Sequence, residues 1–223
     1  MKTDVQIQKD VMEELKWEPG LKTSEIGVTA KDGVVTLSGQ VETYLQKLSA
    51  EQAAKRVSGV MAVAEDIQVG PSSLNARTDS EIAASVLTAL KWNSAVQEEK
   101  IKIRVENGIV KLDGEAETNY QRTQAKKSIE SLPGVRAVLD LIKIKPMVSA
   151  EGIEKKINAA FQRHAALDSK GIDVSVVGSK VILRGKVRSL YEKDDAVDAA
   201  WAAPGVSSVE SHLRIEIPEF DFS

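Results

Sequence analysis

The chain repeats one pattern of residues three times, and this repetition constrains its fold more than any other feature. The phrase VVTLSG at 34–39 returns as IVKLDG at 109–114 and as KVILRG at 180–185. Both this phrase and a later Gly-Val pair shift by 75 residues between the first two copies and by 71 between the last two. A shared offset indicates that whole units were duplicated. Because the period exceeds the roughly 20–50 residues of solenoid repeats, each unit is expected to be a small domain.

Composition places the chain among globular proteins and excludes several classes of site. Its 223 residues are 42% hydrophobic and 28% charged, and none is cysteine, which rules out disulfides, thiolate metal sites and a cysteine nucleophile. No apolar run approaches the roughly 18 residues of a membrane span. The N-terminal residues lack the apolar region of a signal peptide, so we expect a cytoplasmic protein, or a periplasmic one if a leader was removed.

The net charge of −3 argues against a polyanion-binding chain as a whole. Residues 71–146 are the exception, with 12 basic and 10 acidic side chains for a net charge of +2. This excess is interpreted either as scatter among solvated charges or as a weak contact with an anionic surface.

Comparison of the three copies predicts the elements of one unit. Apolar residues spaced by four predict an amphipathic first helix with the stripes Ile7, Val11, Leu15; Ile82, Val86, Leu90; and Ile153, Ile157, Phe161. Asp4, Asp79 and Ser149 lie near its start, where N-caps are expected. Alternating apolar residues then predict strands from Ile26, Ile101 and Ile172. A second helix is expected around 43–57, 118–132 and 189–203, followed by a closing strand.

The glycines are predicted to shape turns and not to bind a ligand, because they occur singly and not in a phosphate-binding cluster. Asp32-Gly33 and Asn107-Gly108 are signals of a type I′ hairpin, and Gly178-Ser179 suits a type II′ turn at the same place. A bulge or a bend is expected at the end of the second strand, at Gly39, Gly114 and Gly185. A left-handed helix cap is expected after the second helix, at Gly59, Gly134 and Gly205.

The predicted fold class is therefore α+β, with three tandem α-β-β-α-β units. Each unit is expected to hold a three-stranded mixed sheet with two helices packed on one face. The predicted domains are residues 1–70, 77–146 and 147–218, with a short C-terminal tail at 219–223. The stretch at 70–78 is polar and rich in turn residues, whereas the joint at 145–148 is shorter, so units 2 and 3 are expected to pack more closely.

This pattern resembles the BON domain, the bacterial osmotically inducible and nodulation domain. The resemblance rests on the first helix, the Asp/Asn-Gly hairpin, the xVxLxG strand and the Pro-Gly-Val after the second helix, and it covers nearly the whole chain. It implies a non-enzymatic protein linked to osmotic stress and to binding at phospholipid interfaces. Many members are periplasmic or lipid-anchored. This chain is expected to depart from them, since the sequence shows neither a leader nor a lipobox cysteine and holds three copies where two are common.

No arrangement of residues predicts catalysis, a metal site or a cofactor. The two histidines, His164 and His212, occur once each without partners at metal-binding spacing. Acidic pairs such as Glu98-Glu99 are adjacent in sequence, so their side chains diverge on a helix or strand. No P-loop, GxGxxG or GxSxG motif is present.

A basic strip on unit 2 is the main signal for an anionic partner other than lipid. Lys100, Lys102 and Arg104 alternate with apolar residues along a predicted strand, and Lys111 follows nearby. The strip is interpreted as a solvated sheet face or as a weak nucleic-acid contact. Nucleic acid is the less favoured partner because the strand lacks aromatic residues on which bases could stack.

The tryptophans are the better indication of function. Trp17 and Trp92 occupy equivalent positions near the end of the first helix, each preceded by a lysine, Lys16 or Lys91. Such a pair is typical of a membrane-interface anchor, and it is also a common way to cap a small core. Trp201 stands where the other copies have Lys55 and Glu130, which predicts a position that faces outward toward a partner, another unit, or the linker or tail.

Three functions remain open at this stage. The first is a non-enzymatic stress protein that contacts anionic phospholipid through Lys16, Trp17, Lys91, Trp92 and Trp201, with avidity supplied by several weak modules. The second is a chaperone-like protein that holds unfolded clients along its sheet edges and the face around Trp201. The third is a scaffold in which the units pack together and bury all three tryptophans.

Overall fold

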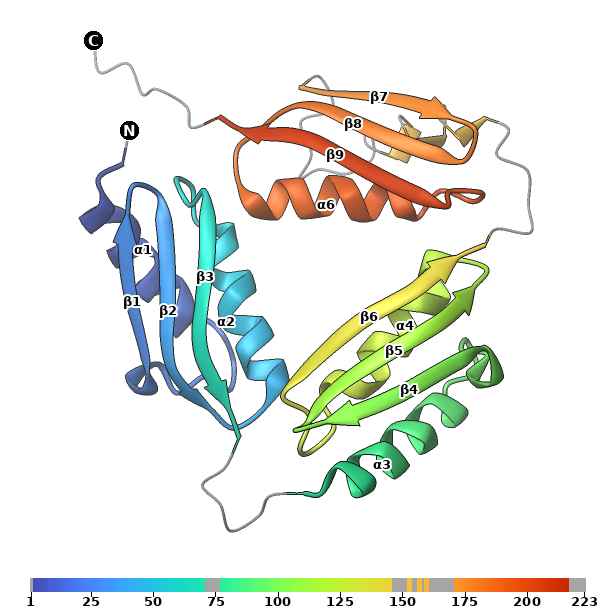
Figure 1. The fold of residues 1–223 in the computed structure, drawn as a ribbon. Coiled ribbons are helices and arrows are strands. Elements are labelled where there is room, and N and C mark those ends of the chain that lie inside the picture. The colour runs from blue at the N-terminus through green and yellow to red at the C-terminus, as the bar shows by residue number, and fades with distance from the viewer. Residues whose placement is uncertain are drawn as a thin grey trace.

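Each repeat folds as the α-β-β-α-β unit that the sequence predicts, and the three units lie around a common centre in the computed structural model (Figure 1). The structure describes residues 2–70, 77–145, 152–153, 156–157, 159–160 and 171–216. Unit 1 contains α1 (Asp4–Lys16), the 3₁₀ helix η1 (Thr23–Glu25), β1 (Ile26–Lys31), β2 (Val34–Val41), α2 (Tyr44–Arg56) and β3 (Ala62–Val69). Unit 2 contains α3 (Asp79–Trp92), η3 (Glu98–Lys100), β4 (Ile101–Glu106), β5 (Ile109–Ala116), α4 (Asn119–Glu130) and β6 (Ala137–Ile144). Unit 3 contains β7 (Ile172–Val177), β8 (Lys180–Val187), α6 (Leu190–Trp201) and β9 (Ser208–Ile215).

The first helix of unit 3 is described only in part. Ile153 and Ile157 are helical and buried against the unit 3 core, as the apolar stripe predicts. The predictions for Ser149, Phe161, His164, the joint at 146–148 and the tail at 219–223 lie outside the described residues, as does 71–76 of the first linker.

The second strand is the centre of each sheet. In unit 1 it pairs antiparallel with β1 and parallel with β3, and units 2 and 3 repeat the same order and register. The helices pack on one face and close a separate core in each unit around Val35 and Leu37, Val110 and Leu112, or Val181 and Leu183. The other face of each sheet stays open, because the apolar residues of the strands alternate toward the helices.

The hairpin turns have the predicted types. Asp32 and Gly33 both have positive φ, as do Asn107 and Gly108, which is the conformation of a type I′ turn. Gly178 alone has positive φ in the third turn, as a type II′ turn requires. Two-residue loops result in every case, since Lys31 pairs with Val34 and Val177 pairs with Lys180.

A bulge or a bend was predicted at Gly39, Gly114 and Gly185, at the end of the second strand. The strand neither bulges nor ends there, and what sets these glycines apart is their positive φ. Each second strand continues two residues further without a break in register, ending for example at Val41. The glycine is needed because its φ is positive and a Cβ atom would overlap the carbonyl oxygen of the residue before the first strand, Gly171 in the case of Gly185. A close backbone approach, and not a bulge, therefore explains the conserved spacing of the motif within the chain.

The N-caps of the first helices are threonines and not the predicted aspartates. Thr3 and Thr78 each form a capping box, with Gln6 and Glu81 as the third helical residues. Asp79, one position later, instead accepts hydrogen bonds from the amides of Asn107 and Gly108 at 2.8 and 2.9 Å. Asp4 bonds the first hairpin turn in the same way. These aspartates thus tie the start of the first helix to the tip of the hairpin.

The three units contact one another through their second helices, of which α2 and α6 face the centre in Figure 1. Tyr44 of α2 packs into the unit 2 core, where burial raises the pKa of its hydroxyl above the ordinary value of 10.0. Leu190 of α6, at the equivalent position, packs on the unit 1 core. Trp201 at the end of α6 packs against the unit 2 core, with Arg122 of α4 over its ring at 5.0 Å. Unit 1 thus contacts unit 2, unit 2 contacts unit 3, and unit 3 contacts unit 1, which closes a ring.

The position equivalent to Tyr44 and Leu190 is occupied in unit 2 by a polar residue, Asn119. Its Oδ1 atom is buried and accepts no hydrogen bond from any part of the chain that the structure describes. A buried polar atom without a partner destabilises a protein by about 1–3 kcal/mol. Asn119 is therefore expected to contribute less to stability than Tyr44 or Leu190 does at the equivalent position.

We expect Gly185→Ala to destabilise unit 3 by about 3 kcal/mol or more, because the new Cβ meets backbone and the φ is strained. The matched control is Gly178→Ala in the same unit, which also has positive φ but has no atom within 4 Å of a Cβ, and should cost only about 1 kcal/mol. Both are measured by urea unfolding in a Trp17→Phe, Trp92→Phe background, where Trp201 is the single tryptophan. Equal losses for the two variants would contradict the close-approach explanation.

We expect Asn119→Leu to stabilise the protein by about 1 kcal/mol, because leucine removes the unpaired amide and mimics Leu190. The control is Asn93→Leu, which should destabilise it by a similar amount, since Asn93 donates to Ser128 and accepts from the amide of Ala95. Urea unfolding followed by Trp201 fluorescence measures both. A loss of stability in Asn119→Leu would show that the amide has a partner.

Candidate membrane-contact surface

Trp17 and Trp92 project into solvent at equivalent ends of two helices. Their side chains are 82% and 83% exposed. The reason is helical geometry: each lies two residues, or about 200°, beyond the last buried residue of its stripe, Leu15 or Leu90. The core-capping interpretation therefore does not hold for either tryptophan, and an exposed aromatic side chain of this size requires another explanation.

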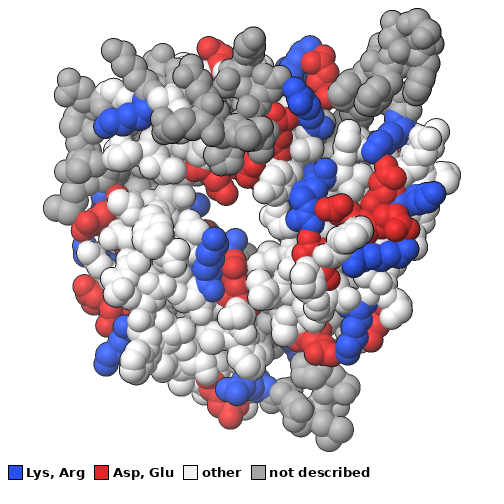
Figure 2. Space-filling model, turned by 180° about the vertical axis from the view of Figure 1, so that it is seen from behind, with Lys and Arg blue, Asp and Glu red and all other residues white. Residues whose placement is uncertain are grey.

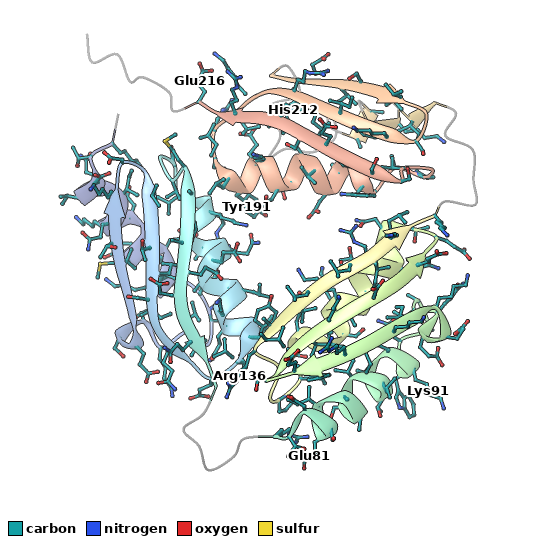
Figure 3. The ribbon with its side chains drawn as sticks, viewed as in Figure 1. Glu81, Lys91, Arg136, Tyr191, His212 and Glu216 are labelled. Atoms are coloured by element: carbon teal, nitrogen blue, oxygen red, sulfur yellow. The ribbon has the colours of Figure 1, made fainter. Side chains whose placement is uncertain are left out.

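A lysine accompanies each tryptophan. Lys16 forms an exposed ion pair with Glu13 at 2.8 Å, whereas Lys91 forms no ion pair within the described part of the chain. Lys91 lies at the end of α3 on the outside of the molecule (Figure 3). The two helix ends thus combine an apolar ring with a nearby cation, which is the composition of an interfacial anchor.

A second exposed apolar residue at each helix was missed in the sequence. Met12 and Leu87 occupy equivalent positions, one turn before Lys16 and Lys91, and both are exposed. Alignment of the copies could have found them, because both are apolar and lie off the buried stripe. We name the two triplets Met12, Lys16, Trp17 and Leu87, Lys91, Trp92 the helix-end patches.

Trp201 does not belong to this surface, and its predicted lipid contact is corrected. It is only partly exposed and packs against the cores of units 2 and 3. The charged residues Lys55 and Glu130 at the equivalent positions indicated an outward-facing site, and Trp201 does reach the neighbouring unit, but it also contacts its own core. The scaffold interpretation, in which the units pack together, thus holds for Trp201 and not for the other two tryptophans.

The predicted basic strip is only partly formed. Lys100 ends η3, outside the strand, and pairs with Glu117 at 3.2 Å, so it does not share the strip. Lys102 and Arg104 do point from β4 toward the open face of the sheet, and Lys111 lies directly opposite Arg104. Arg104 also pairs with Glu106 at 3.3 Å, which reduces the local positive charge. Aromatic residues are absent from these two strands.

Charged side chains of both signs border a hollow at the centre of the ring (Figure 2). Lys55 of α2 forms an ion pair with Glu51 of the same helix at 2.8 Å and another with Asp194 of α6 at 2.9 Å. The second ion pair joins units 1 and 3. Burial raises the pKa of Asp198, and the neighbouring Asp194 and Asp195 raise it further. Acidic and basic groups are thus interspersed around the hollow, so its surface is neither uniformly positive nor uniformly negative.

Glu65 on β3 is a second carboxylate whose pKa is raised by burial. Burial raises its pKa above the ordinary value of 4.5, and the neighbouring Glu51 raises it further, against the opposing effect of Lys47 at 3.3 Å. Its Oε1 atom is buried and accepts no hydrogen bond from the described residues. A proton on Glu65 would supply the missing bond to Glu51.

The described residues contain no cluster of histidine, cysteine or acidic side chains that could hold a metal ion. His212 is exposed beside Glu210 at 2.6 Å on the open face of the unit 3 sheet. Among the described helices, none is both long and apolar enough to cross a membrane.

Three copies of one small α+β unit, closed into a ring by their second helices, define a tandem-domain protein. The chain belongs to the BON domain family, whose model matches residues 3–71, 78–146 and 149–217. The expected triple tandem organisation is thereby confirmed.

The chain is similar to named bacterial proteins. It is 29% identical over 133 residues to the osmotically-inducible protein Y of Escherichia coli (strain K12), which covers 56% of this chain and 64% of that protein. It is 32% identical over 151 residues to the 21 kDa hemolysin of Actinobacillus pleuropneumoniae, which covers 62% of this chain and 74% of the hemolysin. The match thus spans less than two thirds of osmotically-inducible protein Y. A solved structure of CdsD, a structural protein of the type III secretion system of Chlamydia trachomatis, aligns over 95% of this chain and 92% of its own at 15% identity, but its TM-score of 0.28 supports no inference.

We expect Glu65→Gln to raise the thermal unfolding midpoint at pH 7. The pKa of Glu65 is higher in the folded than in the unfolded protein, so the folded state loses stability as the pH rises above about 4.5, and glutamine removes that loss. The gain should shrink as the pH falls to 4. Glu42→Gln is the control, because Lys22 lowers the pKa of Glu42 and the substitution should not stabilise the protein at any pH. A gain for Glu65→Gln that is independent of pH would contradict the assignment.

Proposed function

We propose that this chain is a stress-related, non-enzymatic protein that contacts anionic phospholipid surfaces through its helix-end patches. The observation that carries the proposal is the exposure of Trp17 and Trp92 beside lysines at equivalent ends of two helices. The stress-related role is supported by membership of the BON domain family and by similarity to osmotically-inducible protein Y.

The two patches contribute to the free energy of binding to the phospholipid surface in two ways, by burial of apolar side chains and by attraction between their lysines and the anionic headgroups. A tryptophan side chain buries about 200 Å² when fully removed from water, worth up to about 5 kcal/mol, and less at a headgroup interface. One such contact is weak once the loss of motional freedom is counted. Two patches carried on one chain bind with a combined affinity that exceeds that of either alone when both reach the surface.

A second candidate function is favoured by the open face of the unit 2 sheet. Leu139 and Leu141 of β6 are 53% and 48% exposed there, beside Lys111 of β5. Exposed leucines on an open sheet face suit the apolar segments of an unfolded client. Because Trp201 is occupied between units, this face replaces the surface around Trp201 in the chaperone-like hypothesis.

The test of the lipid proposal is co-sedimentation with vesicles of phosphatidylglycerol and phosphatidylcholine across a salt titration. We expect retention at low salt, with a blue shift of tryptophan fluorescence, and at least about tenfold weaker binding for the Trp17→Ala, Trp92→Ala double variant. Tyr120→Ala is the matched control, since Tyr120 is an exposed aromatic residue on α4, outside the patches.

Two results would overturn the lipid proposal: no retention of the wild-type chain at low salt, or equal retention of the double variant. Suppression of client aggregation without vesicle binding would support the second candidate in its place. Loss of that suppression in Leu139→Ser would then locate the client on the open face of unit 2.

A further inference from the structure

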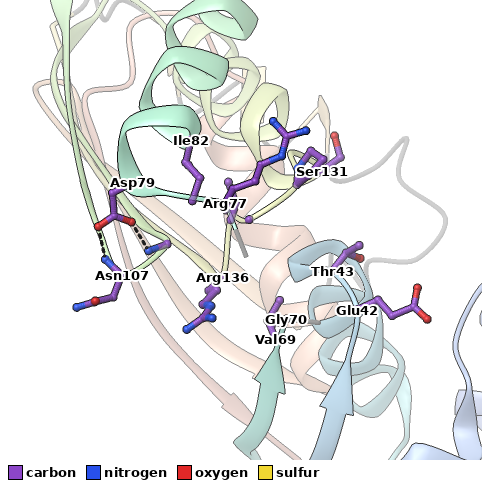
Figure 4. Close-up of a pocket in the computed structure, with 14 residues that line it drawn as sticks. Glu42, Thr43, Val69, Gly70, Arg77, Asp79, Ile82, Asn107, Ser131 and Arg136 are labelled. Atoms are coloured by element: carbon purple, nitrogen blue, oxygen red, sulfur yellow. Dashed lines mark hydrogen bonds between the residues drawn. The ribbon is translucent and has the colours of Figure 1, made fainter. Parts of the chain in front are cut away.

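A cavity of about 700 Å³ lies at the junction of units 1 and 2 (Figure 4). Unit 1 contributes the end of β3 and the residues before α2, and unit 2 contributes the start of α3, the β4–β5 hairpin and the turn before β6. This volume is in the range that accommodates small-molecule ligands. The cavity lies at the start of α3, whereas the helix-end patch of unit 2 lies at the other end of that helix.

The acidic residues that line the cavity are already engaged. Asp79 accepts hydrogen bonds from two hairpin amides, at 2.8 Å from Asn107 and 2.9 Å from Gly108. Glu42 forms an ion pair with Lys22 at 2.7 Å. Neither carboxylate therefore needs a cation from within the cavity.

The two basic residues of the cavity, Arg77 and Arg136, are not engaged in this way. Neither guanidinium forms an ion pair or a side-chain hydrogen bond to any residue that the structure describes. Glu81, in the first turn of α3, accepts hydrogen bonds from both the amide and the hydroxyl of Thr78 at 2.8 Å. These hydrogen bonds lower the pKa of Glu81 and the charge of Arg77 helps to lower it, but Arg77 and Glu81 form no ion pair within the described residues. The cavity therefore carries two unpaired positive charges.

The repeat provides an internal control on these arginines. The positions equivalent to Arg136 hold Met61 and Ser207, and that equivalent to Arg77 in unit 1 holds Lys2, which pairs with Asp10 at 2.7 Å. The same unit therefore folds without this pair of arginines. Since the fold does not require them, their joint presence at one cavity points to a ligand.

The arginines are placed to join the two units. The guanidinium of Arg136 lies beside Gly70 at the end of β3, where a Cβ would be 3.6 Å from its Nε and Nη2 atoms. Figure 4 shows Arg77 extending in a different direction, toward Ser131. A ligand that reaches both guanidinium groups must therefore be elongated, with anionic groups at both ends.

We propose that the cavity between units 1 and 2 binds an elongated phosphate compound through Arg77 and Arg136. A guanidinium group donates two parallel hydrogen bonds to a phosphoryl group, which suits it to this ligand class. The hydroxyl groups of Thr43 and Ser131 line the same cavity and can donate to further phosphate oxygens. This site is separate from the proposed membrane contact, because neither Trp17 nor Trp92 lines the cavity. A ligand bound there would contact unit 1 and unit 2 at the same time.

The test is titration calorimetry of the full chain with inorganic tripolyphosphate at low salt. We expect binding that weakens at least about tenfold in Arg77→Gln and in Arg136→Gln, and further in the double variant. Arg104→Gln is the matched control and should bind as the wild type does, because Arg104 lies outside this cavity and pairs with Glu106. Circular dichroism and the thermal midpoint establish that each variant is folded.

Absence of binding by the wild type, or equal weakening in Arg104→Gln, would overturn the proposal. Phosphatidylglycerol vesicles distinguish the source of the phosphate. If the Arg77→Gln, Arg136→Gln variant loses tripolyphosphate binding but keeps vesicle retention, the ligand is a soluble compound. If it loses both tripolyphosphate binding and vesicle retention, the ligand is a lipid headgroup. The Trp17→Ala, Trp92→Ala variant should bind tripolyphosphate normally, which separates this site from the proposed membrane contact.

Discussion

The insertion of one residue from the start of a second helix into the core of the next unit holds this molecule together. Tyr44 does this between units 1 and 2, and Leu190 between units 3 and 1. Domains of about 70 residues bury little of their surface and are marginally stable alone. Units 1 and 2 therefore gain apolar burial from their neighbours, and the starts of α2 and α6 are engaged in contacts between units.

Ring closure decides which surfaces stay available. The second helices and Trp201 are occupied by contacts between units, whereas the first-helix ends and the open sheet faces remain in solvent. The helix-end patches of units 1 and 2 are consequently the largest exposed aromatic features among the described residues. Sequence comparison alone cannot make this distinction, because a tryptophan that replaces a charged residue looks the same whether it faces water or another unit.

Local chemistry made much of the fold predictable. Helical stripes, alternating strands and Asp-Gly or Asn-Gly turns depend on residues that are close in sequence. Comparison of the three copies therefore predicted these elements correctly. The errors arose where distant residues decide the outcome. Asp79 was predicted to cap a helix but bonds a hairpin 28 residues away, and Gly185 faces a carbonyl of the preceding turn. The cavity with Arg77 and Arg136 depends on how units 1 and 2 meet, which no local pattern encodes.

The three junctions differ in chemistry, because equivalent contact positions have diverged between the units. Lys55 meets Asp194 between units 1 and 3, while Arg122 stacks on Trp201 between units 2 and 3. At the junction of units 1 and 2, Tyr44 packs into the unit 2 core. The residue of unit 2 that is equivalent to Asp194 is Thr123, so Lys55 placed against unit 2 would keep its ion pair with Glu51 and lose the one with Asp194. Each junction thus has a contact that the others lack, which favours the observed neighbours over an exchanged arrangement.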